Sequence, residues 1–188
     1  SVTVAEEGSV NITLAGTDVE GSTLTFTVGT PTSGTLTGTA PNLTYTPNAN
    51  FCGVDSFTYF ANDVQCNSAV AATVTITVTC INDCPVAGAD VYATDEDTAI
   101  NEVAPALLAN DSDVDIGDTI NVIAEVILST QGATVTLSAD GSFIYDPTGS
   151  FAIQSLGDGD LLMDTFSYQL TDGDCTVMGS VTVNITGI

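Results

Sequence analysis

The chain has 188 residues, 44% of them hydrophobic, which is enough apolar material for one large core or two small ones. It carries 24 acidic residues and no Lys, Arg or His, so its formal net charge is −24 at pH 7. The missing basic side chains exclude a Ser-His-Asp or Cys-His catalytic site, a lysine Schiff base and a basic surface for nucleic acid or anionic membranes.

Short stretches that alternate apolar and polar residues follow one another along the chain and are separated by Gly, Pro and Asn, as in β-strands joined by turns. In the first half they are Ser1–Ala5, Val10–Ala15, Thr23–Val28, Leu43–Pro47, Ser56–Ala61 and Thr73–Thr79. In the second half they are Ala93–Ile100, Ile120–Ile127, Ala133–Ser138, Ser142–Pro147, Thr165–Leu170 and Ser180–Ile185. Strands this short, at this spacing, predict an all-β fold of the Greek-key β-sandwich type.

The second half repeats motifs of the first. Glu6-Glu7-Gly8 matches Glu96-Asp97-Thr98, and the strand that begins Asp55-Ser56-Phe57 matches the one that begins Asp164-Thr165-Phe166. A period close to the size of one sandwich predicts two tandem domains. We expect them to span residues 1–81 and 86–188, joined by a linker at residues 82–85.

Several of these motifs form a recognisable set. They are Glu96-Asp97-Thr98, Leu107-Leu108-Ala109-Asn110-Asp111-Ser112-Asp113, Asp140-Gly141-Ser142-Phe143-Ile144-Tyr145, the Asp-x-Phe-x-Tyr strand and Asn82-Asp83-x-Pro85. Over essentially the whole chain they resemble the cadherin-like tandem repeats of bacterial giant adhesins. The resemblance implies two immunoglobulin- or cadherin-like sandwiches of a secreted bacterial protein. An insertion at Ala152–Met163 departs from the pattern, and it is either a recognition loop or an ordinary variable loop.

Acidic residues fall in loops that we expect at the facing ends of the two sandwiches. The candidate metal ligands are Glu6, Glu7, Asp55, Asn82, Asp83, Asp111, Asp113 and Asp115. So many carboxylates repel one another unless a cation is present, and Ca²⁺ accepts about six to eight oxygen ligands. The sequence therefore predicts interdomain calcium, in an arrangement that resembles the calcium junction between cadherin domains. The alternative is that Asp and Asn occur here because they stabilise turns.

Comparable half-sites are predicted at the outer ends of the two domains. One would consist of Asp18, Glu20 and Asp63, and the other of Glu96, Asp97 and Asp164. Each half-site would need a neighbouring domain to complete it.

The chain has five cysteines, so at least one has no partner within it. Cys52 and Cys80 both lack a counterpart in the second repeat, as a bonded pair would, and a Cys52–Cys66 bond would have to span a strand of about 20 Å. We predict the disulfides Cys52–Cys80 and Cys84–Cys175, with Cys66 bonded to a preceding repeat. The alternative is a set of buried free thiols in a reducing compartment.

Four Asn-x-Ser/Thr sequons are candidate glycosylation sites, at Asn11, Asn42, Asn110 and Asn184. Such triplets also occur by chance in a chain this rich in Thr.

These features predict a structural repeat segment of an extracellular cell-surface adhesin or filament, rigidified by calcium and disulfides, with neighbouring repeats of the same chain or filament as its partners. The alternative function is a recognition module for a glycan or protein receptor. A glycosidase that uses two carboxylates is a third possibility, but we do not expect an enzyme. No apolar run approaches the roughly 18 residues of a membrane span, so we expect no membrane insertion, and a secretion signal would lie upstream of Ser1.

Overall fold

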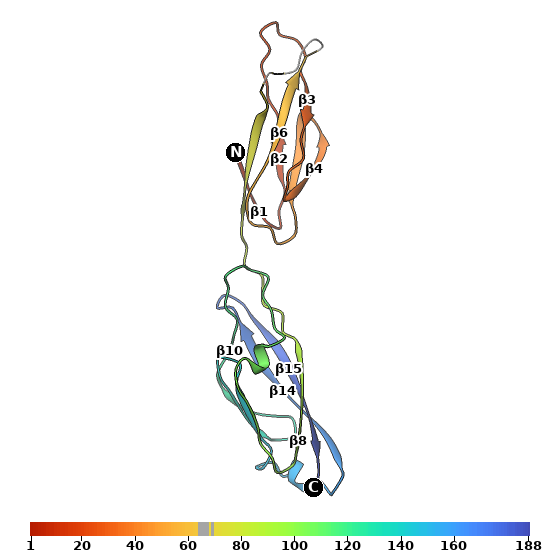
Figure 1. The fold of residues 1–188 in the computed structure, drawn as a ribbon, viewed down its shortest axis with the longest axis vertical. Helices are drawn as coiled ribbons and strands as arrows, with labels where there is room; N and C mark the ends of the chain where they lie inside the picture. The colour runs from red at the N-terminus through yellow and green to blue at the C-terminus, as the bar shows by residue number, and fades with distance from the viewer. Residues whose placement is uncertain (64–67, 69) are drawn as a thin grey trace. The chain divides into compact units, whose positions relative to one another are not determined.

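The computed structural model describes residues 1–63, 68 and 70–188, and it divides into two compact units, Ser1–Ile81 and Asn82–Ile188 (Figure 1). Residues 82–85, predicted as a linker, are grouped with the second unit. Each unit is described by itself. In the described part of the chain, no helix has the length and apolar character needed to cross a membrane.

The first unit is a β-sandwich, as the sequence predicts. Its strands are β1 (Val2–Ala5), β2 (Val10–Thr13), β3 (Thr25–Val28), β4 (Gly34–Thr39), β5 (Asn42–Pro47), β6 (Gly53–Asn62) and β7 (Ala72–Thr79). One sheet has the order β1-β7-β6-β3 and the other β2-β5-β4. β1 and β7 pair in parallel and the remaining neighbours pair antiparallel, which is the Greek-key arrangement of such domains.

Period-2 alternation builds the core of this unit, because successive side chains of a strand point to opposite faces of the sheet. On β7, Ile76 and Val78 are buried whereas Thr75 and Thr77 are exposed. The sequence did not predict β4. Its glycines interrupt the alternation, and Leu36 is its one large apolar side chain. Pairing with β5 therefore determines this strand more than its own residue pattern does.

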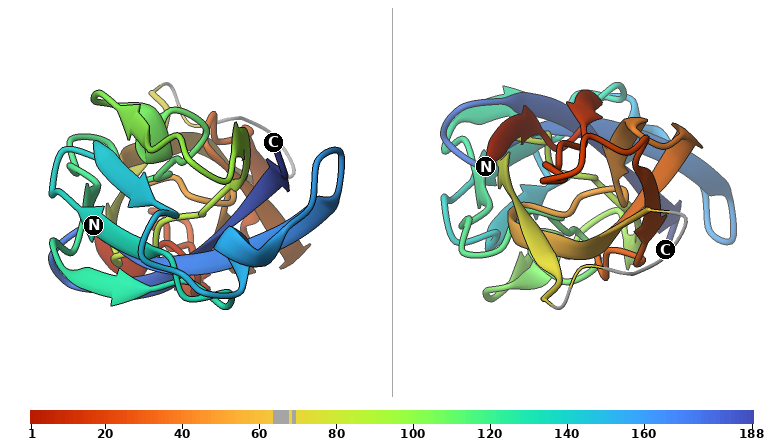
Figure 2. Two further views of the ribbon diagram at one scale, coloured as in Figure 1. Left: turned by 90° about the horizontal axis from the view of Figure 1, so that it is seen from below. Right: turned by 90° about the horizontal axis from the view of Figure 1, so that it is seen from above.

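The second unit is also a β-sandwich. Its strands are β8 (Ala89–Asp95), β9 (Ile100–Glu102), β10 (Asn121–Val122), β11 (Val126–Leu128), β12 (Thr134–Leu137), β13 (Phe143–Asp146), β14 (Leu161–Thr171) and β15 (Thr176–Thr186). The sheets have the orders β10-β14-β15-β8 and β11-β12-β13-β9. β14 and β15, in blue in Figure 2, form a long antiparallel hairpin.

Two strand predictions for the second unit were wrong in extent. The stretch Ala93–Ile100 contains the end of β8, a turn and the first residue of β9. The acidic residues Glu96 and Asp97 lie in this turn, where they interrupt the alternation of the stretch. The stretch Ile120–Ile127 is divided between β10 and β11, which belong to different sheets.

Two 3₁₀ turns extend the core of the second unit. The turn η1 (Ala106–Leu108) buries Leu107 completely, and η2 (Ile153–Ser155) buries Ile153 completely. η2 lies in the insertion at Ala152–Met163, whose last residues belong to β14. The insertion therefore packs on its own domain through Ile153, as an ordinary structural loop does.

Each unit holds one of the two predicted disulfides. Cys52 and Cys80 are bonded in the first unit with a Cα–Cα distance of 4.9 Å. Cys84 and Cys175 are bonded in the second with a Cα–Cα distance of 5.4 Å. Cys66 lies outside the described residues.

Candidate metal sites

The predicted calcium ligands belong to both units, so each set is described in its own domain. In the first unit Glu6 follows β1 and its side chain is buried. Its carboxylate oxygen Oε1 accepts a hydrogen bond from the backbone N–H of Ile81 at 2.5 Å, and its own N–H donates to the carbonyl oxygen of Thr79 at 3.1 Å. Glu7 is exposed beside it. A buried carboxylate thus holds the last residues of the first domain against the β1–β2 turn.

Asp55 has a different role from the one predicted. It lies within β6 and is buried, and its oxygen Oδ2 accepts hydrogen bonds from the Tyr45 hydroxyl at 2.8 Å and from the Ser33 N–H at 3.0 Å. Its oxygen Oδ1 accepts from the N–H of Thr32 at 3.1 Å and of Ser56 at 2.8 Å. A cation at Asp55 would have to break these bonds. The carboxylate instead holds the β3–β4 connection to the core.

The hydrogen bonds also set the protonation of Asp55. Burial by itself raises the pKa of this carboxyl, but the hydrogen bond from Tyr45 and the backbone N–H groups of Ser56, Ser33 and Thr32 outweigh it, so the pKa lies below its ordinary value. Burial, followed by the bond to Asp55, raises the pKa of Tyr45. The pair is therefore a neutral phenol that donates to a carboxylate.

Asp164 repeats this arrangement in the second unit, although the sequence assigned it to an outer half-site. It is fully buried on β14 and accepts hydrogen bonds from the Tyr145 hydroxyl at 2.6 Å, the Thr130 hydroxyl at 2.8 Å, the Gln131 N–H at 2.8 Å and the Ser129 hydroxyl. The Asp-x-Phe-x-Tyr motif therefore has a folding role in both domains. Its Asp is a buried residue within the strand, whereas the prediction placed it just before the strand.

Three other aspartates of the second unit do form a cluster. One carboxylate oxygen from each of Asp113, Asp115 and Asp118 lies within 4.8 Å of the others. The N–H of Asp115 donates to Asp113 Oδ1 at 2.9 Å, and Asp113 Oδ2 is buried without a hydrogen-bond partner among the described residues. A buried carboxylate oxygen without a donor is costly, and a bound cation would satisfy it. The donor set consists of hard oxygens and fits calcium.

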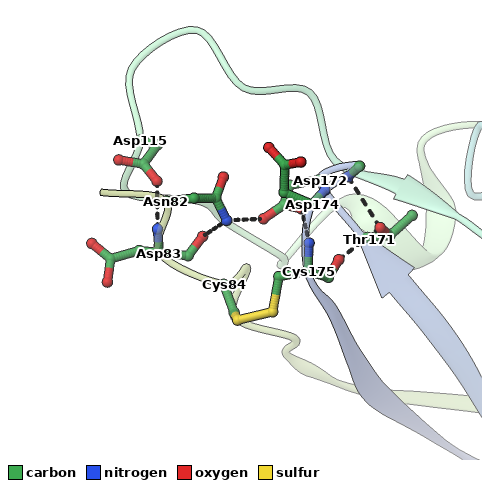
Figure 3. Close-up of a disulfide and its surroundings, with 9 residues drawn as sticks. Asn82, Asp83, Cys84, Asp115, Thr171, Asp172, Asp174 and Cys175 are labelled. Carbon is green, nitrogen blue, oxygen red and sulfur yellow. Dashed lines mark hydrogen bonds between the residues drawn. A yellow bond between two sulfur atoms is a disulfide. The ribbon is translucent and has the colours of Figure 1, made fainter. Parts of the chain in front are cut away.

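Further acids crowd the same loop. The N–H of Asp83 donates to Asp115 Oδ2 at 2.7 Å, and the amide nitrogen of Asn82 donates to Asp172 Oδ2 at 3.1 Å. The Cys84–Cys175 disulfide holds these residues beside the β14–β15 turn (Figure 3). Desolvation, followed by the negative charges of Asp115 and Asp113 and those of the turn, raises the pKa of Asp118.

The prediction of individual ligands missed two members of this group. Asp172 and Asp174 were not among the candidate ligands, although their charges act on Asp118. Their signal in the sequence was the alternate spacing Asp172-Gly173-Asp174, the same spacing that marks the other loop. The two loops lie far apart in the sequence, and residues 83–84 contact both: the Asp83 N–H donates to Asp115, and Cys84 is bonded to Cys175.

Asp111 is directed away from this cluster. Its Oδ1 accepts the Gly88 N–H at 2.7 Å and its Oδ2 accepts the Tyr168 hydroxyl at 2.9 Å. Asp90 lies close by, and burial, followed by the charge of Asp111, raises its pKa. Asp111 therefore takes part in a hydrogen-bond network inside the second unit, which is not the ligand role predicted for it.

Glu96 is the counterpart of Glu6. It is buried after β8, and its Oε1 accepts the N–H of Ile188 at 3.2 Å, as Glu6 accepts that of Ile81. Its Oε2 is buried without a hydrogen-bond partner in the described part of the chain, and Asp97 beside it is exposed. The predicted equivalence of these two turns is therefore visible in their hydrogen bonds.

The four sequon asparagines are exposed, and three lie in strands: Asn11, Asn42 and Asn184. Asn110 follows η1 and donates to the carbonyl oxygen of Ala89 at 3.1 Å. Their glycosylation stays a prediction.

Comparison with known proteins places both sandwiches in one family. Residues 1–80 and residues 82–187 each match the bacterial cadherin-like domain. The chain belongs to the bacterial cadherin-like domain family. The resemblance inferred from its motifs is therefore confirmed, and residues 82–187 form its second cadherin-like domain. No curated protein sequence matches the chain.

Solved structures support the same fold. A human protocadherin-24 EC1-2 fragment matches with a TM-score of 0.59 at 14% identity, over 100% of this chain and 94% of that one. Drosophila N-cadherin EC1-4 matches with a TM-score of 0.52 at 12% identity, over 100% of this chain and 47% of that one. The chain also spans 28% of the length of an endo-fucoidan hydrolase of glycoside hydrolase family 107, at a TM-score of 0.39 and 18% identity.

Proposed function

We propose that this chain is a structural segment of tandem cadherin-like repeats from an extracellular adhesin or filament, in which calcium and disulfides stiffen the chain. The observation that carries the proposal is the cluster of Asp113, Asp115 and Asp118, with a buried Asp113 oxygen that has no donor. Membership of the bacterial cadherin-like family supports a repeat role on the cell surface. Small interfaces between domains of one chain rarely hold the domains rigid, so a stiff stalk needs such cross-links.

Calcium would be held by the aspartates of the second domain. Asp113, Asp115 and Asp118 supply carboxylates, the N–H of Asp83 donates to Asp115, and the side-chain amide of Asn82 donates to Asp172. The sequence analysis also predicts Glu6 and Glu7 of the first domain as ligands. The ion supplies positive charge that offsets the repulsion among these groups.

Disulfides support an extracellular location. Both bonds join the end of a domain to its own body: Cys80 follows β7, and Cys84 precedes β8. Such bonds persist in oxidising compartments and are rare in the cytosol. We propose that Cys66 bonds a cysteine of a preceding repeat, so that covalent links continue along the molecule.

We further propose that the chain has no enzymatic activity. The sequence contains no His, Lys or Arg, and two of its buried aspartates, Asp55 and Asp164, are each saturated by hydrogen bonds from their own domain. A glycosidase needs two carboxyl groups free to exchange protons or attack the sugar. Hydrolysis assays on mixed polysaccharides, including fucoidan, should give no product above background.

The calcium proposal is tested by titrating the chelator-treated chain with Ca²⁺ in a calorimeter. We expect saturable binding that the triple variant Asp113→Asn, Asp115→Asn, Asp118→Asn abolishes. The control variant Asp146→Asn changes a carboxylate at the end of β13 that accepts hydrogen bonds from Thr148, and it should bind as the parent does. Small-angle scattering with and without Ca²⁺ should show a longer, stiffer particle with the ion. Equal affinity in the triple variant, or scattering that is the same with and without Ca²⁺, would contradict the proposal.

A further inference from the structure

One side of the first domain is open. The edge strands β3 and β4 leave between them a slot of about 750 Å³, lined by apolar side chains and threonines. Phe26 and Val28 of β3 and Leu36 of β4 point toward the core, yet all three are only partly buried. The side chains that line the slot are uncharged, and the sequence contains no acidic residue from 21 to 54.

The second domain closes the equivalent side with a strand of its own. Leu36 lies opposite Tyr45 in the first domain, and Val135 lies opposite Tyr145 in the second. Leu36 and Val135 therefore occupy corresponding positions. Val135 is completely buried, because β11 pairs antiparallel with β12 and places Ile127 directly opposite it. The second domain thus shows which kind of element fits beside this strand.

The path of the chain before this strand accounts for the difference. In the second domain the chain leaves β14 after Ile123, whose N–H bonds the carbonyl of Gln169, and it crosses to the other sheet as β11. In the first domain the chain remains paired with β6 through β3 and as far as Gly29, whose N–H donates to the carbonyl oxygen of Thr58. The shorter connection that follows contains Pro31, which cannot donate to a ladder. Among its described residues, the first domain therefore has no strand that covers this edge.

The exposed edge of β4 offers backbone groups as well as apolar surface. Within the described residues β4 pairs with β5 alone, and in an antiparallel pair alternate residues direct their N–H and C=O groups away from the partner. A strand added here would form main-chain hydrogen bonds along β4 and place every second side chain in the slot.

We propose that the slot between β3 and β4 is a docking site for an extended segment of another protein, which adds antiparallel to β4 as β11 adds to β12. The uncharged slot selects aliphatic residues at alternate positions of that segment. Charge complementarity favours basic residues on either side of the docked segment, because this chain carries 24 acidic residues and no basic residue. Two of the acidic residues, Asp18 and Glu20, shortly precede Leu24 at one end of the slot. A second copy of this chain would bring only negative charge and is disfavoured for the same reason.

The test uses the full chain and a peptide based on residues 124–130, flanked by two lysines at each end, in which the two residues that share a face with Ile127 are replaced by valine (Glu125→Val and Ser129→Val). Backbone amide NMR should show shifts confined to β3, β4 and their flanks. Hydrogen exchange should slow at alternate amides of β4, the pattern that a new antiparallel partner produces. Shifts elsewhere, or no shifts at millimolar peptide, would overturn the proposal.

Two matched substitutions locate the contact. Leu36→Gln should weaken binding at least about tenfold, because the burial of aliphatic surface in the slot is lost. Thr37→Ser changes the exposed face of the same strand and should bind as the parent does. Replacing the isoleucine of the peptide by serine should also weaken binding at least about tenfold, and this arm leaves the fold of the protein untouched. Equal affinity for both peptides, or a dimer of the free chain that protects the β4 amides, would contradict docking of a partner strand.

Discussion

The buried aspartate of the second domain gives the sharpest stability prediction. Asp164 is fully buried, and replacing it by Asn keeps its volume but puts an NH₂ group where a carboxylate accepts hydrogen bonds. Whichever way the amide is oriented, its NH₂ meets donors: the hydroxyls of Tyr145 and Ser129 face Oδ2, and the Thr130 hydroxyl and the Gln131 N–H face Oδ1.

The expected loss of stability follows from these contacts. Hydrogen bonds to a charged acceptor contribute about 1.5–3 kcal/mol each, and a buried donor left unpaired costs about 1–3 kcal/mol. Some donors will rotate to other acceptors, so we expect Asp164→Asn to lower the free energy of unfolding of the second domain by about 3–5 kcal/mol. An exposed loop substitution such as Asp158→Asn should change it by less than about 0.5 kcal/mol.

Urea unfolding at pH 7, followed by circular dichroism with the disulfides intact, measures this difference. A second arm uses pH. Hydrogen bonds hold the pKa of Asp164 below its ordinary value despite the opposing effect of burial, so its contribution to stability is present above the ordinary carboxyl pKa and is lost as pH falls through the lowered one. The gap between parent and variant should therefore narrow in acid. A variant within about 0.5 kcal/mol of the parent at pH 7, or a gap that widens in acid, would refute the reasoning.

The remaining predictions concern covalent links and close packing. Replacing both cysteines of the Cys52–Cys80 bond by Ser should lower the free energy of unfolding by about 3.5 kcal/mol, and opening Cys84–Cys175, which closes a longer loop, should lower it by about 4.5 kcal/mol. Urea titration of each double variant measures both, and the reverse order would contradict a loop-entropy origin. Gly179→Ala should destabilise the second domain by about 1–3 kcal/mol, because a Cβ there would lie 2.1 Å from the Tyr168 ring, whereas Gly149→Ala, which meets nothing within 4 Å, serves as its control in thermal melts.

Much of the candidate site was readable from residue type and spacing, and some of it was not. Alternating aspartates marked the loop that holds Asp113 and Asp115, and the loss of two cysteines together from the second repeat predicted a bond that the structure contains. Residue type and spacing could not separate Asp55 from these ligands. An inward-facing Asp in a strand and a loop Asp have the same letter, and only the position of Tyr45 beside the carboxylate distinguishes them.

The sequence by itself determined the fold class and the number of domains, because period-2 alternation and repeated motifs are local properties of the chain. It also predicted two disulfides that the structure contains. Only the tertiary structure decided which carboxylates are enclosed by donors and which are left clustered without them, since that depends on side chains brought together from distant strands. It also decided that one sandwich closes its side with β11 while the other leaves β4 open. The alternation in Ile120–Ile127 gave no sign that its two halves belong to different sheets, because the sheet that a strand joins depends on its partners.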